Sequence, residues 1–135
     1  MKDIFETDVY HIFLKKAEES LNAAQSCFEQ EYYNSCVNRA YYTMFQAAVA
    51  VLFKAGFRPK SEKIGHDWVQ AEFSRAFVSG SKRFPHLKGL LNLVQEVRDI
   101  ADYSDEEISE KRAKRNLDKA VFLSEKFQRR SGNED

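Results

Sequence analysis

Glycine and proline are scarce in this sequence, which has five glycines and two prolines among its 135 residues. With 43% hydrophobic residues, this composition fits one compact helical domain rather than two domains. A chain of this length can bury a real hydrophobic core.

Cysteine is rare as well, since the chain has only Cys27 and Cys36. Both lie inside predicted helices, lack the spacing of a zinc site and are too few for a disulfide framework, so we expect small buried hydrophobic residues. Neither sign of charge predominates, because 21 Lys and Arg balance 21 Asp and Glu. Any contact with RNA must therefore come from a local patch.

Motifs for membrane insertion and for metal or cofactor chemistry are also missing. No apolar run approaches a membrane span and the first residues lack an apolar signal segment, so we expect a cytoplasmic protein without membrane contact. The sequence has no Glu-x-x-His or His-Glu-x-x-His pair, no phosphate-binding glycine loop and no Gly-x-Ser-x-Gly elbow. We expect neither a metal nor a cofactor.

Apolar residues recur at spacings of three and four through five segments, and no strand pattern competes with them. The first segment runs from about Tyr10 to Phe28. The second runs from Glu31 to Gly56, whose glycine suits a helix C-terminus. A loop near 57–63 precedes a third helix from about Ile64 to Val78, and a fourth helix follows Pro85 and ends near Tyr103.

Ser104 to Glu107 has the form of a capping box and predicts the start of the fifth helix. The chain is therefore predicted to be all-α, an up-and-down bundle of about five helices. Residues 1–127 form this single domain, and residues 128–135 form a polar C-terminal tail without apolar anchors.

The second helix is expected to have two occupied faces. One face is apolar, and the opposite face carries polar and aromatic residues at helical spacing, namely Ser35, Arg39, Tyr42, Gln46, Val49 and Phe53. Two explanations remain open. The helix is either central and packed on both sides, with Arg39 held by a carboxylate, or it borders a cleft or a dimer seam.

Arg98 lies in the apolar stripe of the fourth helix, four residues after Val94 and seven after Leu91. A guanidinium buried without a partner is costly, and Asp102, one turn later, is the nearest candidate partner. Either the pair is structural, or Arg98 lies beside a cavity and binds an anion such as phosphate.

Among the three histidines, His66 is the candidate for a functional role, because it lies near the start of the third helix beside Asp67 and Trp68. The alternative is a structural histidine at a helix start. His11 is expected at the surface or at its boundary.

Two runs of residues resemble signatures of small prokaryotic HEPN proteins. Asn38–Ala48 reads NRAYYTMFQAA, and Arg98–Tyr103 reads RDIADY; the family patterns are Arg-Ala-Tyr-Tyr-Ala-Met-Phe-His-Ala and Arg-x-x-Ala-Asp-Tyr. The similarity of pattern extends from about Phe13 to Phe127. It implies a helical bundle that pairs through a two-fold interface, so we expect a homodimer.

The resemblance also implies a choice of functions. HEPN proteins include metal-independent endoribonucleases, commonly toxins paired with minimal nucleotidyltransferase antitoxins, and also non-catalytic members. The catalytic members carry Arg-x(4–6)-His, in which the histidine accepts the proton of an RNA 2′-hydroxyl and the arginine stabilises charge on the phosphate. Here Tyr103 stands where that histidine would, and Gln46 replaces a histidine of the second helix. A phenol, with a pKa of about 10, is a poor base at neutral pH.

We therefore expect a HEPN component of a two-gene system with a minimal nucleotidyltransferase partner and a cleft that binds RNA or phosphate. A degenerate endoribonuclease site would use three candidate catalytic residues, Arg98, Asp102 and Tyr103. The candidate ligand contacts are Arg39, Tyr42, Gln46 and His66. One alternative is that the protein is a non-catalytic module that binds a nucleotide or a protein. Another is that the partner nucleotidyltransferase adenylylates this protein at Tyr103 or Tyr42.

The positions of Arg98 and Tyr103 set one geometric condition. Five residues of helix separate them by about 140° around the helix axis. The two side chains can therefore converge only if the helix ends near Tyr103.

Overall fold

The computed structural model describes residues 4–61, 63–76 and 89–133, with the side chains of 9–61, 63–76 and 89–127. These residues form five helices and no strand, which confirms the prediction of an all-α bundle. The helices are α1 (Ile4–Glu29), α2 (Tyr33–Lys54), α3 (His66–Phe73), α4 (Leu90–Tyr103) and α5 (Glu110–Asn133).

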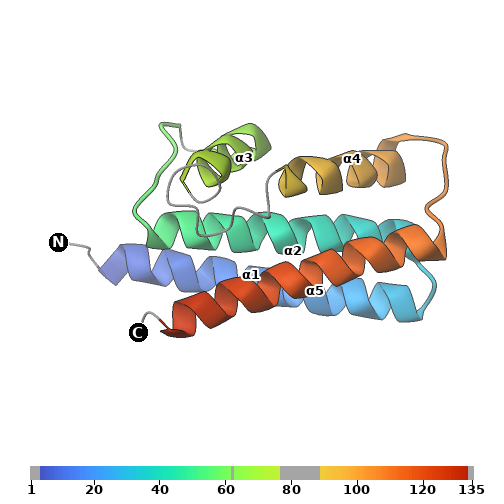
Figure 1. Cartoon of the computed structure of the whole chain (residues 1–135), viewed down its shortest axis with the longest axis horizontal. Helices are drawn as coiled ribbons and strands as arrows, with labels where there is room; N and C mark the ends of the chain where they lie inside the picture. Colours follow the sequence, from blue (N-terminus) through green and yellow to red (C-terminus); the bar gives the residue numbers. More distant parts are fainter. Residues whose placement is uncertain (1–3, 62, 77–88, 134–135) are drawn as a thin grey trace.

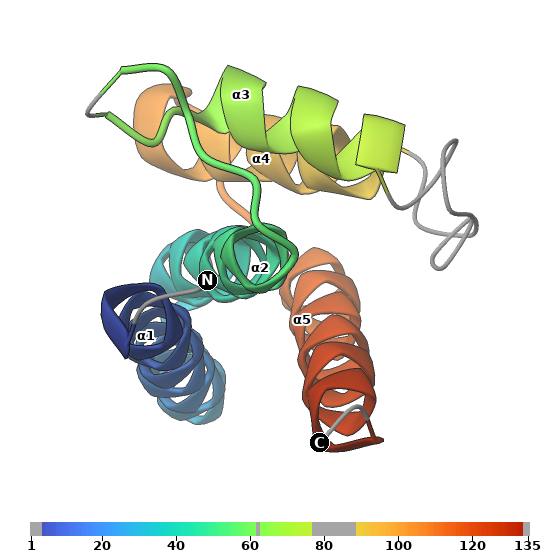
Figure 2. The same ribbon diagram turned by 90° about the vertical axis from the view of Figure 1, so that its left-hand side faces the viewer.

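The helix α2 lies at the centre of the molecule. Seen end-on in Figure 2, α1 and α5 cover one side of α2, while α3 and α4 cover the opposite side. The long helices α1, α2, α4 and α5 alternate in direction along the chain, as Figure 1 shows. The short α3 is inserted between α2 and α4, so the up-and-down arrangement is kept.

Burial of α2 explains its unusual composition. All of its residues from Ala47 to Phe53 are buried, and the apolar members of its mixed stripe, Val49 and Phe53, are among them. Each large apolar side chain buried in this way stabilises the fold by about 1.5–3 kcal/mol. Val49 and Phe53 are therefore packed as the first explanation expects, but Arg39, which that explanation pairs with a carboxylate, donates to the amide oxygen of Asn38 instead.

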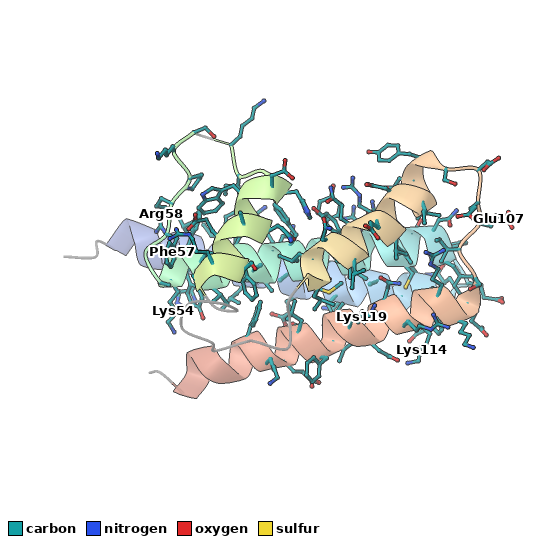
Figure 3. The ribbon with its side chains drawn as sticks, turned by 45° about the horizontal axis from the view of Figure 1, so that its top comes forward. Lys54, Phe57, Arg58, Glu107, Lys114 and Lys119 are labelled. Carbon is teal, nitrogen blue, oxygen red and sulfur yellow. The ribbon has the colours of Figure 1, made fainter. Side chains whose placement is uncertain are left out.

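The end of α2 is held by a Schellman motif, as the glycine at its C-terminus predicts. Gly56 has a φ of 95°, and its N–H donates to Phe53 O (3.0 Å) while the N–H of Phe57 donates to Leu52 O (3.0 Å). Arg58 adds a side-chain cap, since its Nη1 donates to Phe53 O and Phe57 O at 3.0 and 2.7 Å. Figure 3 shows Phe57 and Arg58 beside this end of α2.

The start of α5 differs from the prediction. Ser104 ends α4 in an extended conformation and accepts a hydrogen bond from the N–H of Glu106 (2.9 Å), but no α-helix follows it directly. The helix begins at Glu110, and Ser109 provides the N-cap by accepting from the N–H of Arg112 (3.1 Å). The prediction that Ser104 to Glu107 opens the last helix is therefore wrong.

A tertiary contact explains the later start. Ile108 is buried, and its N–H donates to Asn34 Oδ1 on α2 (3.2 Å). This contact fixes residues 104–109 as an extended connection across the end of the bundle, in which Figure 3 places Glu107. Ile108 and Ala113 then occupy the N′ and N4 positions of a hydrophobic staple around Ser109.

Other boundaries are close to the predicted ones. The helix α3 starts at His66 rather than Ile64, and α4 ends at Tyr103 as expected. Val78 and Pro85 lie outside the described residues. Residues 128–133, predicted as a polar tail, continue α5. Of the two cysteines, Cys36 is buried, which raises the pKa of its thiol to about 11.

The serine that caps α5 can be tested directly. We expect Ser109→Ala to lower the free energy of unfolding by about 1 kcal/mol, because an N-cap acceptor is lost. Ser104→Ala is the matched control and should cost less, since Ser104 caps no helix. Urea denaturation followed by circular dichroism measures both free energies of unfolding. A larger loss in Ser104→Ala than in Ser109→Ala would show that Ser104 caps the last helix, as the sequence predicted.

Candidate functional site

The predicted site gathers around Arg98, which α4 presents to α2. Leu91 and Val94 of the same stripe are buried, so α4 turns this face inward. The Arg98 side chain is 15% exposed, and its Cζ lies 4.8 Å from the centroid of the Tyr41 ring. A largely buried guanidinium that lies on an aromatic ring is weakly hydrated, and such a group binds carboxylate or phosphate well.

Two aspartates of α4 compensate the charge of Arg98. Its Nη2 donates to Asp99 Oδ1 at 3.0 Å, whereas its Nε lies 3.8 Å from Asp102 Oδ2. The sequence predicted Asp102 as the nearest partner, but the closer carboxylate is Asp99. Asp102 is shared with α2, because its Oδ2 accepts from Asn38 Nδ2 at 2.8 Å.

The guanidinium is incompletely paired. Its Nε is buried and has no hydrogen-bond partner among the described residues, although Asp102 is near. Burial by itself would lower the pKa of Arg98, but the hydrogen bond to Asp99 and the charges of Asp99 and the neighbouring tyrosines raise it. Arg98 therefore stays cationic and keeps a buried donor with capacity for a further acceptor.

Arg39 and Tyr42 complete the α2 side of the site. Arg39 donates to Asn38 Oδ1 from Nε (3.0 Å) and Nη2 (2.7 Å), and its Cζ lies 5.2 Å from the Tyr42 ring. The Tyr42 hydroxyl accepts from Arg98 Nη1 at 3.3 Å. Asn38 thus links Arg39 to Asp102, so one polar network joins α2 to α4.

Tyr103 forms the outer wall of the site. The helix α4 ends at this residue, which satisfies the geometric condition set by the sequence. The Tyr103 ring centroid lies 5.8 Å from Arg98 Cζ, yet the residue is 77% exposed. One face of the arginine is therefore flanked by a ring that solvent can reach.

His66 joins the site through Tyr41 of α2. The Tyr41 hydroxyl lies 2.9 Å from His66 Nδ1, while the ring of Tyr41 carries Arg98. Burial raises the pKa of Tyr41 to about 12 against the opposing charge of Arg98. The sequence could have indicated this contact, because a buried tyrosine hydroxyl usually needs a hydrogen-bond partner on a neighbouring element.

Gln46 lies apart from these residues. Its amide pairs with Ser20 Oγ of α1 at 2.7 Å, and with the amide nitrogen facing α1 it donates to Lys16 O at 2.9 Å. The structure therefore brings together Arg39, Tyr42, His66, Arg98, Asp102 and Tyr103 but not Gln46. Asn38, Tyr41 and Asp99 belong to the site and were not predicted.

Comparison with known proteins supports the resemblance on which these predictions rest. A model of the HEPN domain matches residues 10–130. The chain belongs to the HEPN family. It is 31% identical over 113 residues to "Putative toxin MJ0142" of Methanocaldococcus jannaschii, covering 82% of this chain and 74% of that protein.

The alignments with two further relatives span most of each relative's length. "Putative toxin MJ0605" of the same archaeon is 26% identical over 132 residues, which is 96% of each chain. A "UPF0332 protein" of Thermotoga maritima is 32% identical over 91 residues, 67% of this chain and 66% of the relative. The HEPN model, which matches residues 10–130, includes α2, α3 and α4, which carry the site.

The described part of this HEPN chain has neither a cluster of metal ligands nor a helix that could span a membrane. Within it, no three His, Cys, Asp or Glu side chains are grouped so that they could hold a metal ion. None of its helices is both long and apolar enough to cross a bilayer. The side chains that the site presents are those of its arginines, tyrosines, aspartates and His66.

The setting of His66 predicts a pH dependence of stability. Burial, the largest cause, lowers the pKa of His66 below its usual 6.5, so the unfolded chain binds a proton more readily than the folded chain does. The contribution of His66 to the free energy of unfolding is fully present above pH 6.5, and it falls as the pH drops toward the lower pKa of the folded state. Urea denaturation at about pH 7 and about pH 5 should show a smaller acid loss in His66→Asn than in the wild type; equal losses would contradict the assignment.

Proposed function

We propose that this protein is a toxin-like HEPN protein that binds RNA at the cluster of Arg98, Tyr41, Tyr42 and Tyr103. The observation that carries the proposal is an arginine placed against three tyrosine rings, at 4.8, 5.9 and 5.8 Å from Cζ, of which the outermost is exposed. Proteins bind single-stranded nucleic acid by combining cations for phosphate with aromatic rings for bases. Two relatives with "toxin" in their names support the same assignment.

The charges of the site determine how RNA would bind. Arg39 and Arg98 are opposed by Asp99 and Asp102, so the four groups carry no net charge. A phosphate that binds Arg98 Nη2 must displace Asp99, whose side chain is 48% exposed. Tyr103 would then stack a base beside the bound phosphate. Asp99 therefore competes with RNA for the arginine.

Substitutions of Arg98 and Tyr103 test the binding mode. We expect Arg98→Ala to weaken RNA binding and to lower the salt dependence, because one phosphate contact is lost. Tyr103→Ala should weaken binding by about 1–3 kcal/mol, the usual value of a base stacked on an aromatic side chain. Fluorescence anisotropy with a labelled single-stranded RNA at several salt concentrations measures both effects.

The matched control is Arg75→Ala, which removes an exposed arginine that is paired with Glu72. It removes the same charge away from the tyrosine cluster. Thermal melts of all variants separate weak binding from poor folding. If Arg75→Ala and Arg98→Ala weaken binding equally, RNA recognises only the general charge of the chain and the assigned site is wrong.

Asp99→Asn gives a prediction of the opposite sign. It removes the competing carboxylate while keeping a side chain of the same shape, so we expect RNA to bind more tightly than it does to the wild type. The gain should be largest at low salt, where phosphate contacts are strongest. Weaker binding of RNA by a folded Asp99→Asn variant would show that Asp99 holds Arg98 in its binding position instead.

A non-catalytic module that binds a free nucleotide is the second candidate. The observation that favours it is Tyr103, which occupies the position of the family's catalytic histidine in α4. Both candidates use the same arginine and tyrosines. A thermal-shift series with mononucleotides and with short RNA distinguishes them, because a ligand that binds only the folded chain raises the melting temperature, and the rise grows with the ratio of ligand concentration to Kd.

The homodimer and the minimal nucleotidyltransferase partner stay proposals as well. Ile12, Leu93 and Phe122 are exposed on α1, α4 and α5, but single exposed apolar side chains on different helices do not make a contact surface, so the dimer rests on the resemblance to the family. The exposed Tyr103 is also accessible to a partner that adenylylates tyrosine. Light scattering after size exclusion should give the mass of two chains, and a monomer at micromolar concentration would remove the dimer from the proposal.

A further inference from the structure

An open cavity lies where the end of α1 meets the start of α5. Its volume is about 550 Å³, a size typical of binding sites, and it is lined by Phe28 from α1 and by Glu110, Lys111, Lys114 and Arg115 from α5. Because α1 and α5 cover one side of α2 and α4 covers the other, this cavity is remote from Arg98 (Figure 2). Figure 3 shows Lys114 at the lower edge of α5, with α4 above α5.

Contacts with Tyr33 hold both walls of the cavity. The Tyr33 hydroxyl donates to Glu110 Oε1 at 2.9 Å, which ties the first residue of α5 to the first residue of α2. The Tyr33 ring lies against the Phe28 ring, with the two centroids 5.7 Å apart. The cavity is therefore framed by side chains that already have partners, and its shape follows from the packing of α1, α2 and α5.

Three cations line the cavity and outnumber its one carboxylate. Lys111, Lys114 and Arg115 are exposed, and because the second and third follow the first by three and four residues, they share one face of α5. Lys114 Nζ pairs with Asp118 Oδ1 at 2.9 Å, whereas Lys111 and Arg115 have no ion pair within the part of the chain that the structure describes. Like charges at such spacings destabilise a helix, so an anion bound beside Lys111 and Arg115 would relieve their repulsion.

The interior of the cavity is apolar. The Phe28 ring forms its floor, and the carbon chains of the lysines and of Arg115 form its walls. Lys114 Nζ lies 5.9 Å from the centroid of the Phe28 ring. A ligand that fits this cavity therefore has an apolar group that enters it and anionic groups that meet the cations around it.

RNA matches the cavity less well than an acidic peptide does. Single-stranded RNA needs aromatic faces on which its bases stack, but the Phe28 ring already contacts both the Tyr33 ring and the ammonium of Lys114. An RNA strand that ran from here to Arg98 around this end of the bundle would also meet the exposed acidic side chains of the connection before α5, Asp105, Glu106 and Glu107. A peptide needs neither a stacking surface nor that path.

We propose that this cavity is a docking site for an acidic segment of a partner protein. An apolar side chain of the segment lies against Phe28, and its carboxylates lie beside Lys111 and Arg115. The inference does not rest on the proposed RNA site, because the two sites lie on opposite sides of α2. A ligand at one of them leaves the other open.

A labelled peptide with glutamates on both sides of a central leucine is the probe. We expect it to bind the full chain, with an affinity that falls as the salt concentration rises, because the interacting charges are exposed. Replacing the leucine of the peptide by glycine should raise Kd about 10-fold, the lower end for a buried leucine side chain. Fluorescence anisotropy measures both Kd values, and a Kd above about 1 mM for the leucine peptide would refute the docking site.

The double variant Lys111→Ala/Arg115→Ala tests the cations. Each lost contact between exposed charges should weaken peptide binding about 1.5- to 5-fold, so the double variant should bind more weakly than either single variant. The matched control is Lys15→Ala/Lys16→Ala, which removes two exposed lysines of α1 far from Phe28. Equal losses in the two double variants would show that the peptide follows only the charge of the chain, and the inference would be wrong.

Charge reversal separates binding from a structural role. Lys111→Glu/Arg115→Glu should lose the glutamate peptide and bind the same peptide with lysines in place of the glutamates. Thermal melts confirm that each variant is folded. A folded reversed variant that binds the glutamate peptide as the wild type does would also overturn the inference.

Further outcomes separate this site from the proposed RNA site and from a dimer contact. Arg98→Ala should bind the peptide as the wild type does, and short RNA should not displace the peptide. If RNA displaces it and Lys111→Ala/Arg115→Ala binds RNA more weakly, the cavity belongs to RNA and the inference is wrong. If this variant instead turns a dimer into a monomer in light scattering, the occupant is a second copy of the chain and the inference is wrong as well. If the wild type binds the peptide but no RNA, the proposed function fails and the docking site stands.

Discussion

The burial of α2 on two opposite sides is the constraint on which the rest of this structure depends. Its small residues Ala40, Ala47, Ala48 and Ala50 are buried and let neighbouring helices approach closely, while α1 and α5 pack on one side and α3 and α4 on the other (Figure 2). A helix enclosed in this way has little surface left for solvent. Its polar side chains must therefore find partners on neighbouring helices.

Tyr41 shows the consequence for the functional site. It is buried, so its hydroxyl needs a hydrogen-bond partner and its ring needs a packing surface. His66 of α3 provides the partner, and Arg98 of α4 covers the ring. One enclosed phenol thus joins α3 and α4 to α2, and the site forms where the packing of α2 would otherwise leave polar atoms unpaired.

Local sequence determined the elements of the fold. Helical periodicity predicted five helices, Gly56 predicted the C-terminus of α2, and the fourth helix was correctly predicted to end near Tyr103. The start of α5 was mispredicted because a tertiary contact outweighed the local capping signal. The capping box at Ser104 is a valid local signal, but the burial of Ile108 and its bond to Asn34 delay the helix until Ser109 can cap it.

The sequence by itself determined that Arg98 interrupts an apolar stripe, that Tyr103 occupies the place of a family histidine, and that the chain resembles HEPN proteins. These properties depend on the order and spacing of residues within short runs of the chain, which the sequence reveals directly. Only the tertiary structure decided that Asp99 is the closer partner of Arg98, that Gln46 faces α1, and that His66 and Arg98 share Tyr41. The physical reason is that such contacts depend on how α1, α3 and α4 pack around α2, and no periodicity within one helix encodes the side chains of another.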